Sequence, residues 1–304
     1  MKARINLSAE NRFLLSIAVT FLVFGAELAG GLWSGSLALL SDSAHVFMDI
    51  FALGMSYLAV RLSSLPPDDR HTYGYHRLEV LAALANGLTL AGISAGIFWE
   101  AYRRWQAPQP VNSGEMLAIA AIGLIANLAV ASVLGESGHE HARAAHAARD
   151  LNMESARVHV LGDAVSSLGV ILAGVLILLT GRFWIDPLVS FLIGILILIS
   201  SGRVLRSSLH ILVEGVPEGI SLPRVSESLA DLPGVLGIHD LHIWNICSGT
   251  VALSAHIVVA DQSGESSNRV LQAVNRVLAD EYGIEHTTVQ FECVACNGNH
   301  LAHR

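Results

Sequence analysis

Six long apolar stretches run through this sequence, and they constrain its fold more than any other feature. A helix needs roughly 20 mostly apolar residues to cross the hydrocarbon core of a bilayer. Apolar residues make up 52% of the chain and charged residues only 14%, whereas a soluble domain normally carries about 25% charge. We therefore expect an α-helical membrane protein with six transmembrane helices. The six stretches are residues 13–33, 37–62, 78–101, 114–136, 156–180 and 183–204.

The character of the chain changes after residue 205. Charge returns, Pro217 and Pro223 interrupt the chain, and no later stretch is apolar enough to span a membrane. Periodicity and turn residues predict, in order, a helix, two strands, a second helix and a third strand. This order suggests a small open sheet with helices on one side. The five elements are expected at residues 221–232, 235–246, 251–260, 266–282 and 284–292.

These patterns divide the chain into four expected parts. They are an N-terminal segment (1–12), a six-helix transmembrane domain (13–207), a soluble α/β domain (208–292) and a tail containing Cys and His (293–304).

The distribution of Lys and Arg predicts the orientation. Cytoplasmic segments of membrane proteins carry the excess of both residues. With six spans, only Arg103, Arg104 and Arg182 fall outside. We therefore expect an inner-membrane protein with both termini and the soluble domain in the cytoplasm. Its net charge of −8 makes a nucleic-acid partner implausible. The basic residues expected inside are Lys2, Arg4, Arg12, Arg61, Arg70, Arg77, Arg143, Arg149, Arg157, Arg203 and Arg206.

Two of the apolar stretches each contain His-x-x-x-Asp. One holds His45 and Asp49, and another holds His159 and Asp163. Residues four apart on a helix lie on the same face, so each helix offers an imidazole and a carboxylate to one point. Two such helices would provide a tetrahedral shell that suits Zn²⁺ and its borderline neighbours, with two carboxylates to balance the charge. Because ionisable groups in a span are costly, we predict a metal site here.

Other polar residues in the spans are open to simpler interpretations. The two His-x-x-x-Asp pairs themselves could be polar groups that join helices. Asp42 lies on a different helix face from His45 and Asp49, which favours packing or a role at the helix start. For Glu27, Asn86 and Asp186, lining a cavity and bonding between helices are equally open.

Five segments together resemble the cation diffusion facilitator family, from about residue 10 to 293. The similar subgroup is the bacterial zinc, cadmium and cobalt efflux proteins, which resemble the animal zinc transporters. The segments are 39–49 (LLSDSAHVFMD), 71–84 (HTYGYHRLEVLAAL), 152–166 (NMESARVHVLGDAVS), 184–189 (WIDPLV) and 239–244 (HDLHIW).

The resemblance implies a homodimer of six-span subunits, each with a cytoplasmic ferredoxin-like domain, and metal/proton antiport by alternating access. It assigns the transport-site ligands to His45, Asp49, His159 and Asp163. This ligand set is similar to the zinc-preferring pattern, so Zn²⁺ is the expected cargo, with Cd²⁺, Co²⁺ and Fe²⁺ as alternatives.

Some relatives bind a second ion in the loop between spans two and three. Asp68 and His71 match that pattern, but Tyr75 stands at the third ligand position. His76 could replace it only if the loop shifts. A loop metal site and a plain solvated loop are therefore equally open.

Relatives also bind metal in the soluble domain at positions that match this chain. His239 and His256 lie on the first two predicted strands, and His286 and Glu292 flank the third. For each of these four residues, the alternative is a structural role in which its polar atoms form hydrogen bonds within the protein. Strand alternation places His242 on the opposite face from His239, so we expect it to be structural.

The tail contains Cys293 and Cys296, followed by His300. A lone Cys-x-x-Cys is ambiguous between redox chemistry and metal binding. The nearby histidine favours capture of a soft metal, with a plain tail as the alternative.

Three function classes could use a metal-binding membrane protein. An intramembrane metalloprotease would need His-Glu-x-x-His, which does not occur in the sequence. A membrane-bound metal sensor would not need ligands inside the spans. A proton-coupled metal exporter, which is no enzyme, fits best. Metal and protons should compete for its histidines, because free imidazole has a pKa of about 6.5.

Overall fold

The computed structural model describes residues 9–63, 65–135, 147–247, 249–260 and 264–293. The chain divides into two compact units, residues 1–55 with 86–203 and residues 56–85 with 204–304. The first unit holds most of the long helices, and the second holds a small sheet.

Six helices form the N-terminal two thirds of the chain, and each contains most of one expected span. Among the described residues, five of them are long and apolar enough to cross a membrane, and α2 is not one of these five. Several α2 side chains between 53 and 63 lie outside the described part. The transmembrane architecture is confirmed, while α2 as a sixth span stays a prediction. The helices are α1 (Ala9–Ser34), α2 (Leu37–Ser63), α3 (Arg77–Gln106), α4 (Ser113–Gly135), α5 (Ala147–Thr180) and α6 (Ile185–Leu212).

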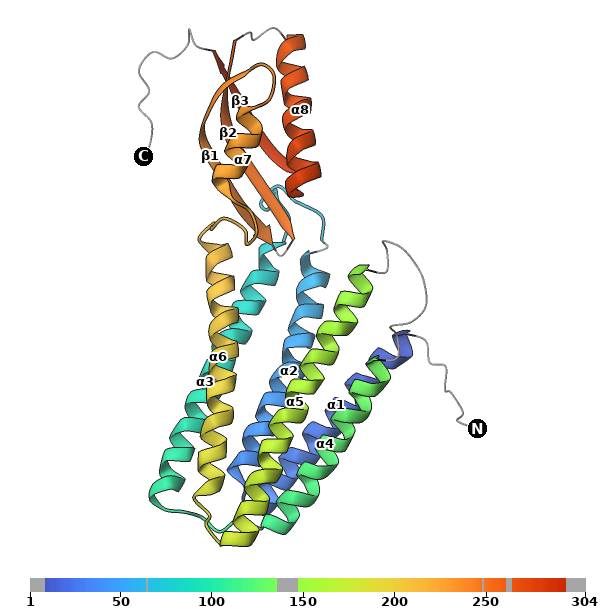
Figure 1. Cartoon of the computed structure of the whole chain (residues 1–304), viewed down its shortest axis with the longest axis vertical. Helices are drawn as coiled ribbons and strands as arrows, with labels where there is room; N and C mark the ends of the chain where they lie inside the picture. Colours follow the sequence, from blue (N-terminus) through green and yellow to red (C-terminus); the bar gives the residue numbers. More distant parts are fainter. Residues whose placement is uncertain (1–8, 64, 136–146, 248, 261–263, 294–304) are drawn as a thin grey trace. The chain divides into compact units, whose positions relative to one another are not determined.

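Hydrogen bonds and close contacts pair the helices. α3 and α6 lie side by side (Figure 1), where the Ser94 hydroxyl donates to the Gly194 carbonyl at 2.7 Å and the Ser201 hydroxyl to the Gly87 carbonyl at 2.8 Å. α4 packs against both α1 and α5. These contacts leave one face of each helix directed outward.

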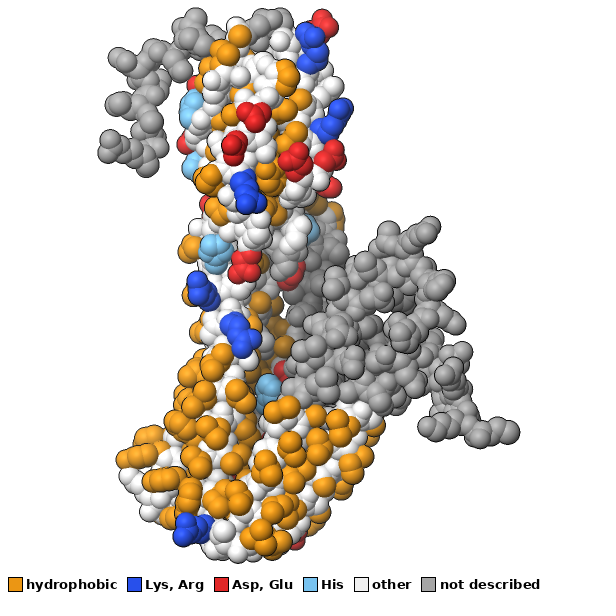
Figure 2. All heavy atoms as spheres, viewed as in Figure 1, with side chains coloured by type: hydrophobic (Ala, Val, Ile, Leu, Met, Phe, Trp, Pro, Cys, Tyr) orange, Lys and Arg blue, Asp and Glu red, His pale blue; other side chains and the backbone are white. Residues whose placement is uncertain are grey.

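The outward faces are apolar. Trp33 and Leu179 are 84% and 76% exposed, which would be unfavourable in water. Figure 2 shows hydrophobic side chains covering the visible face of the described helical bundle, while acidic side chains gather on the soluble domain. Such a surface is suited to lipid.

A buried carboxylate sets the start of α2. Asp186, in the first turn of α6, is fully buried and accepts hydrogen bonds from the main-chain N–H groups of Leu37 at 2.7 Å and Ala38 at 3.1 Å. The hydroxyl of Ser36 donates to it at 2.6 Å. The first N–H groups of a helix have no partner within the helix, so this carboxylate caps α2 from another helix.

The second unit contains the expected α-β-β-α-β order. In its sheet β1 and β2 are antiparallel, and β2 and β3 are parallel. Both helices cover the same face of the sheet (Figure 1). Val225 and Leu229 of the first helix and Val270, Val274 and Leu278 of the second are buried against it. The elements are α7 (Leu222–Ala230), β1 (Val235–Cys247), β2 (Thr250–Val259), α8 (Gly264–Tyr282) and β3 (His286–Cys293).

A β-bulge in β1 corrects the expectation for His242. The register shifts between His239, which pairs with His256, and His242, which pairs with Ser254. Because 254 and 256 share one face of β2, their partners also share a face. Asp240 absorbs the extra residue with a φ of 51°. His242 therefore lies on the open face with His239, and the prediction from simple alternation was wrong.

Candidate metal centre

Three of the four predicted transport-site residues come together inside the helical bundle. The Nε2 atom of His45 lies 3.9 Å from a carboxylate oxygen of Asp49 and 3.6 Å from one of Asp163. One potential ligand atom from each residue falls within 4.8 Å of the others. The side chains of His45, Asp49 and Asp163 are 25%, 21% and 10% exposed, so the group is largely shielded.

The spacing is close to that of a tetrahedral zinc shell. Ligand atoms at about 2.0–2.2 Å from zinc lie about 3.3–3.6 Å from one another. The observed separations of 3.6 and 3.9 Å need only small side-chain movements to reach this geometry. The Nδ1 atom of His45 is buried without a hydrogen-bond partner among the described residues.

The fourth predicted residue, His159, lies in α5 one helical turn before Asp163. Its side chain lies outside the described part of the structure, so its coordination stays a prediction. Asp42 has a different role from the three grouped residues, because its carboxylate accepts hydrogen bonds from Ser166 at 2.5 Å and Ser167 at 3.3 Å. It joins α2 to α5 and helps to bring the two His-x-x-x-Asp segments together.

A second cluster lies on the open face of the sheet. His239 Nε2 lies 3.0 Å from one oxygen of Glu292, and His256 Nδ1 lies 3.0 Å from the other. The two imidazole rings are 5.2 Å apart and nearly perpendicular. These three residues could hold a metal ion, since a ligand atom from each falls within 4.8 Å of the others.

The carboxylates of this cluster are held in their charged form. Desolvation raises the pKa of Glu292, but hydrogen bonds from His239 and Gln290 and the two nearby histidines lower it below its ordinary value overall. The pKa of Asp240 is also lowered, chiefly by its hydrogen bond with His242. Asp240 is not among the residues predicted from the sequence, although its position between His239 and His242 was a usable signal. Both carboxylates are ready to bind a cation at neutral pH.

His286 is not part of this cluster within one chain. It pairs with Ala252, four residues along β2 from His256. At about 3.3 Å per residue, this places it roughly 13 Å away along the strand. A metal role for His286 therefore stays a prediction.

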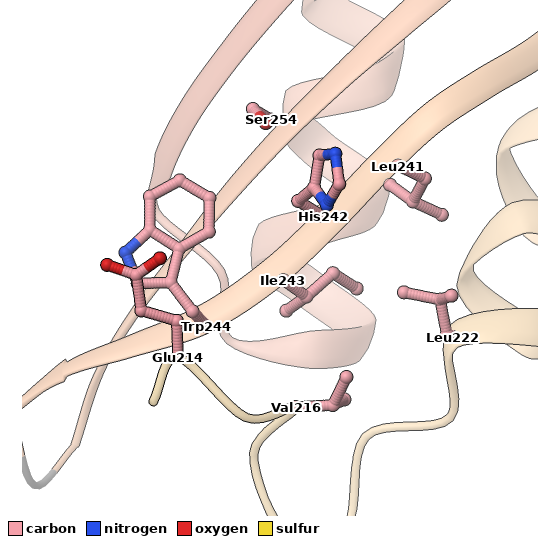
Figure 3. Close-up of a pocket in the computed structure, with 8 residues that line it drawn as sticks. All are labelled: Glu214, Val216, Leu222, Leu241, His242, Ile243, Trp244 and Ser254. Atoms are coloured by element: carbon pink, nitrogen blue, oxygen red, sulfur yellow. The ribbon is translucent and has the colours of Figure 1, made fainter. Parts of the chain in front are cut away.

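His242 faces a different feature, an open hollow beside β1 (Figure 3). Leu222, Leu241 and Trp244 provide apolar lining, and Glu214 lies at its edge. The imidazole of His242 bonds to Asp240 at 3.1 Å. This bond supports the structural role that was expected for His242, though not the face on which it was expected.

In the loop between α2 and α3, protein donors already surround Asp68. Its carboxylate accepts the Tyr75 hydroxyl at 2.7 Å and the main-chain N–H groups of Arg70 at 2.8 Å and His71 at 2.7 Å. The Tyr75 bond is the largest cause that lowers the pKa of Asp68 to about 2. The Tyr75 hydroxyl thus occupies a carboxylate oxygen of Asp68 that a metal ion would need. His76, the possible third ligand, is not among the groups described around Asp68. Metal binding in the loop stays a prediction.

The predicted ligands of the tail lie at or beyond the end of the described residues. Cys293 ends β3, with its side chain outside the described residues, and Cys296 and His300 lie outside them altogether. Soft-metal capture by the tail stays a prediction.

Comparison with known proteins identifies the family. The family model for the cation efflux transmembrane domain matches residues 13–213. The model for the cytoplasmic domain of cation efflux proteins matches residues 217–294. The chain belongs to the cation efflux family. It is a multi-pass membrane transporter of the zinc, cadmium and cobalt efflux subgroup, and its second domain is the cytoplasmic domain of that family.

Characterised members of the cation efflux family align over nearly the whole chain. The metal cation efflux system protein CzcD of Cupriavidus metallidurans is 38% identical over 94% of this chain and 86% of its own length. The cadmium, cobalt and zinc/H(+)-K(+) antiporter of Bacillus subtilis is 40% identical over 89% of this chain and 85% of its own. The zinc transporter ZitB of Escherichia coli is 36% identical over 94% of this chain and 88% of its own length. A solved structure, the metal-bound C-terminal domain of CzcD, is 38% identical over 24% of this chain and 99% of that domain, with a TM-score of 0.22.

Proposed function

We propose that this cation efflux transporter exports Zn²⁺ in exchange for protons through a site formed by His45, Asp49, His159 and Asp163. The observation that carries the proposal is the convergence of ligand atoms from α2 and α5 in a shielded part of the bundle. His45 and Asp49 come from one helix and Asp163 from the other, so relative movement of the two helices would open or close the site.

The donor set favours zinc. One or two imidazoles with two carboxylates suit a borderline divalent ion in tetrahedral geometry. The two carboxylates balance the charge of the ion, which matters in surroundings of low dielectric constant. Relatives are named for zinc, cadmium and cobalt, so Cd²⁺ and Co²⁺ are the first alternatives, followed by Fe²⁺.

Several further features belong to the same proposal. The distribution of Lys and Arg supports an inner-membrane location with both termini in the cytoplasm. The transmembrane domain would span 13–207 and the ferredoxin-like domain 208–292. The open face of the sheet is available to a second copy of the chain, which supports a homodimer. Alternating access in such a dimer would carry the ion from the cytoplasm to the outside.

Flux measurements test the proposal directly. Zinc uptake into inverted membrane vesicles should require an acidic interior and should collapse when an ionophore removes the proton gradient. The driving force disappears because each cycle needs a proton to return the carrier. Uptake that continued at full rate after the ionophore would contradict antiport and favour a channel-like pathway.

We also propose that His239, His256 and Glu292 hold a second ion in the cytoplasmic domain. His256→Ala should lower the zinc bound at saturation to the full-length protein by about one ion per subunit, because three ligands become two. Equilibrium dialysis with metal analysis would measure this. His210→Ala is the matched control, since it changes the same residue type at a position that is not a predicted ligand and whose imidazole lies 2.9 Å from the Val216 carbonyl. Equal zinc content in His256→Ala and the unmodified protein would rule the site out.

A further inference from the structure

Glu27 carries a carboxyl group that is buried inside the helical bundle. It lies in the apolar part of α1, is 1% exposed, and neither of its oxygens has a hydrogen-bond partner among the described residues. Burying a carboxylate in this way strongly disfavours the charged form. The group must therefore be neutral or lie close to a cation.

The bundle provides a specific place for this side chain. A Cβ atom at Gly123 of α4 would lie 2.6 Å from Oε1 of Glu27, too close for any other residue without movement. The same Cβ atom would lie 3.7 Å from Val23, one turn earlier on α1. The carboxyl group thus rests directly against the backbone of α4.

Two carboxyl groups of the described bundle lie near Glu27, Asp42 of α2 and Asp163 of α5. Like charges repel one another, so neither of them stabilises an ionised Glu27. No hydrogen bond is described between Glu27 and either of them. The remaining titratable side chains described on α2 in this region are His45 and Asp49, and α4 has only Glu115, in its first turn. None of these groups supplies a permanent positive charge.

A divalent cation at His45, Asp49 and Asp163 would reverse this situation. Its two positive charges would outweigh the carboxylates next to it and attract an ionised Glu27 instead of repelling it. Charges act on one another more strongly in a medium of low dielectric constant than in water, so binding of the ion would favour loss of the proton from Glu27.

We propose that Glu27 is a proton-binding site separate from the metal ligands, and that it carries a proton when the transport site is empty and loses it when metal binds. One proton leaves the carboxyl group as one metal ion enters, and a proton returns to it when the ion leaves on the other side. The exchange thus operates through charge rather than through a shared ligand atom. The inference rests on the proposed metal/proton exchange and names one of the groups that perform it.

The test compares purified full-length protein with Glu27→Gln, which keeps the shape but cannot ionise. On saturation with Zn²⁺ in weakly buffered solution, Glu27→Gln should still bind zinc but release about one proton fewer per subunit. Infrared difference spectra of the unmodified protein should show the C=O band of a protonated carboxyl group disappearing when zinc is added. That band should be missing from the Glu27→Gln spectra. Glu115→Gln, the same change at an exposed position of α4, should behave like the unmodified protein.

The outcomes separate this inference from the transport function. Proton release and an infrared band in Glu27→Gln that equal those of the unmodified protein would overturn the inference and leave antiport intact. Zinc flux without proton dependence in the unmodified protein would overturn antiport instead. If Glu27→Gln is unstable, Glu27→Asp serves as a second variant. It retains a titratable carboxyl group and should release protons as the unmodified protein does, and a loss of one proton there would also contradict the inference.

Discussion

Replacing Asp163 with asparagine is expected to abolish zinc transport. Asp163 supplies one of the two carboxylates in the three-residue group, and it is the most buried of the three. At an effective dielectric constant of about 20, two unit charges 4 Å apart interact with about 4 kcal/mol. Losing an interaction of this size corresponds to roughly a thousandfold in affinity. Asp49→Asn should have a similar effect for the same reason.

Uptake of radioactive zinc into inverted vesicles would measure this effect at equal amounts of inserted protein. Asp280→Asn is a matched control, because it makes the same change at an exposed position of α8. The control should transport at the rate of the unmodified protein. Uptake by Asp163→Asn at the control rate would remove this residue from the transport site.

Asp186→Ala should have the largest effect on stability. The change removes the acceptor of two N–H groups at the start of α2 and of the Ser36 hydroxyl, all of them buried. It also removes the carboxylate that lies 3.8 Å from Arg104. Breaking a buried charge pair costs about 3–5 kcal/mol. We expect a loss near 3 kcal/mol, the lower end of that range, because Arg104 retains bonds to Glu100 and to the Gly35 carbonyl.

Thermal unfolding in detergent would reveal the loss as a lower midpoint. Zinc transport should fall with it, since α2 carries His45 and Asp49 and its start would no longer be held by α6. Ser190→Ala is the control, because that hydroxyl donates only to the Asp186 main-chain carbonyl in its own helix. The control should lose about 1 kcal/mol at most. Equal midpoints for the two variants would show that the cap contributes little.

The buried acids of the helical bundle are of two kinds. Asp186 and Asp42 are both buried acids with several donors, and they connect α2 to α6 and to α5 respectively. Both residues therefore connect helices. From the sequence, this role was one of two open possibilities for Asp186, and packing was one of two roles favoured for Asp42. Glu27 is as deeply buried, but the described part of the chain offers its carboxyl group no donor. A buried acid with donors stabilises a position, whereas one without donors is free to exchange a proton.

The sequence by itself determined the elements and the family. Apolar length predicted the helices, because a bilayer requires about 20 apolar residues for each crossing. Residue periodicity predicted the order of α7, β1, β2, α8 and β3, because burial on one face is a local property of a helix or strand. The pairing of His45 with Asp49 followed from the pitch of one helix. All of these depend on residues that are near one another in the chain.

Only the tertiary structure decided which distant groups meet. The approach of Asp163 to His45 depends on the packing of α5 against α2. The position of the Glu27 carboxyl group against α4 depends on the absence of a side chain at Gly123. The bulge at Asp240 turned His242 to the open face, a change that period-two alternation could not anticipate. Contacts between distant segments depend on packing and on strand register, and the local pattern of residues determines neither of them.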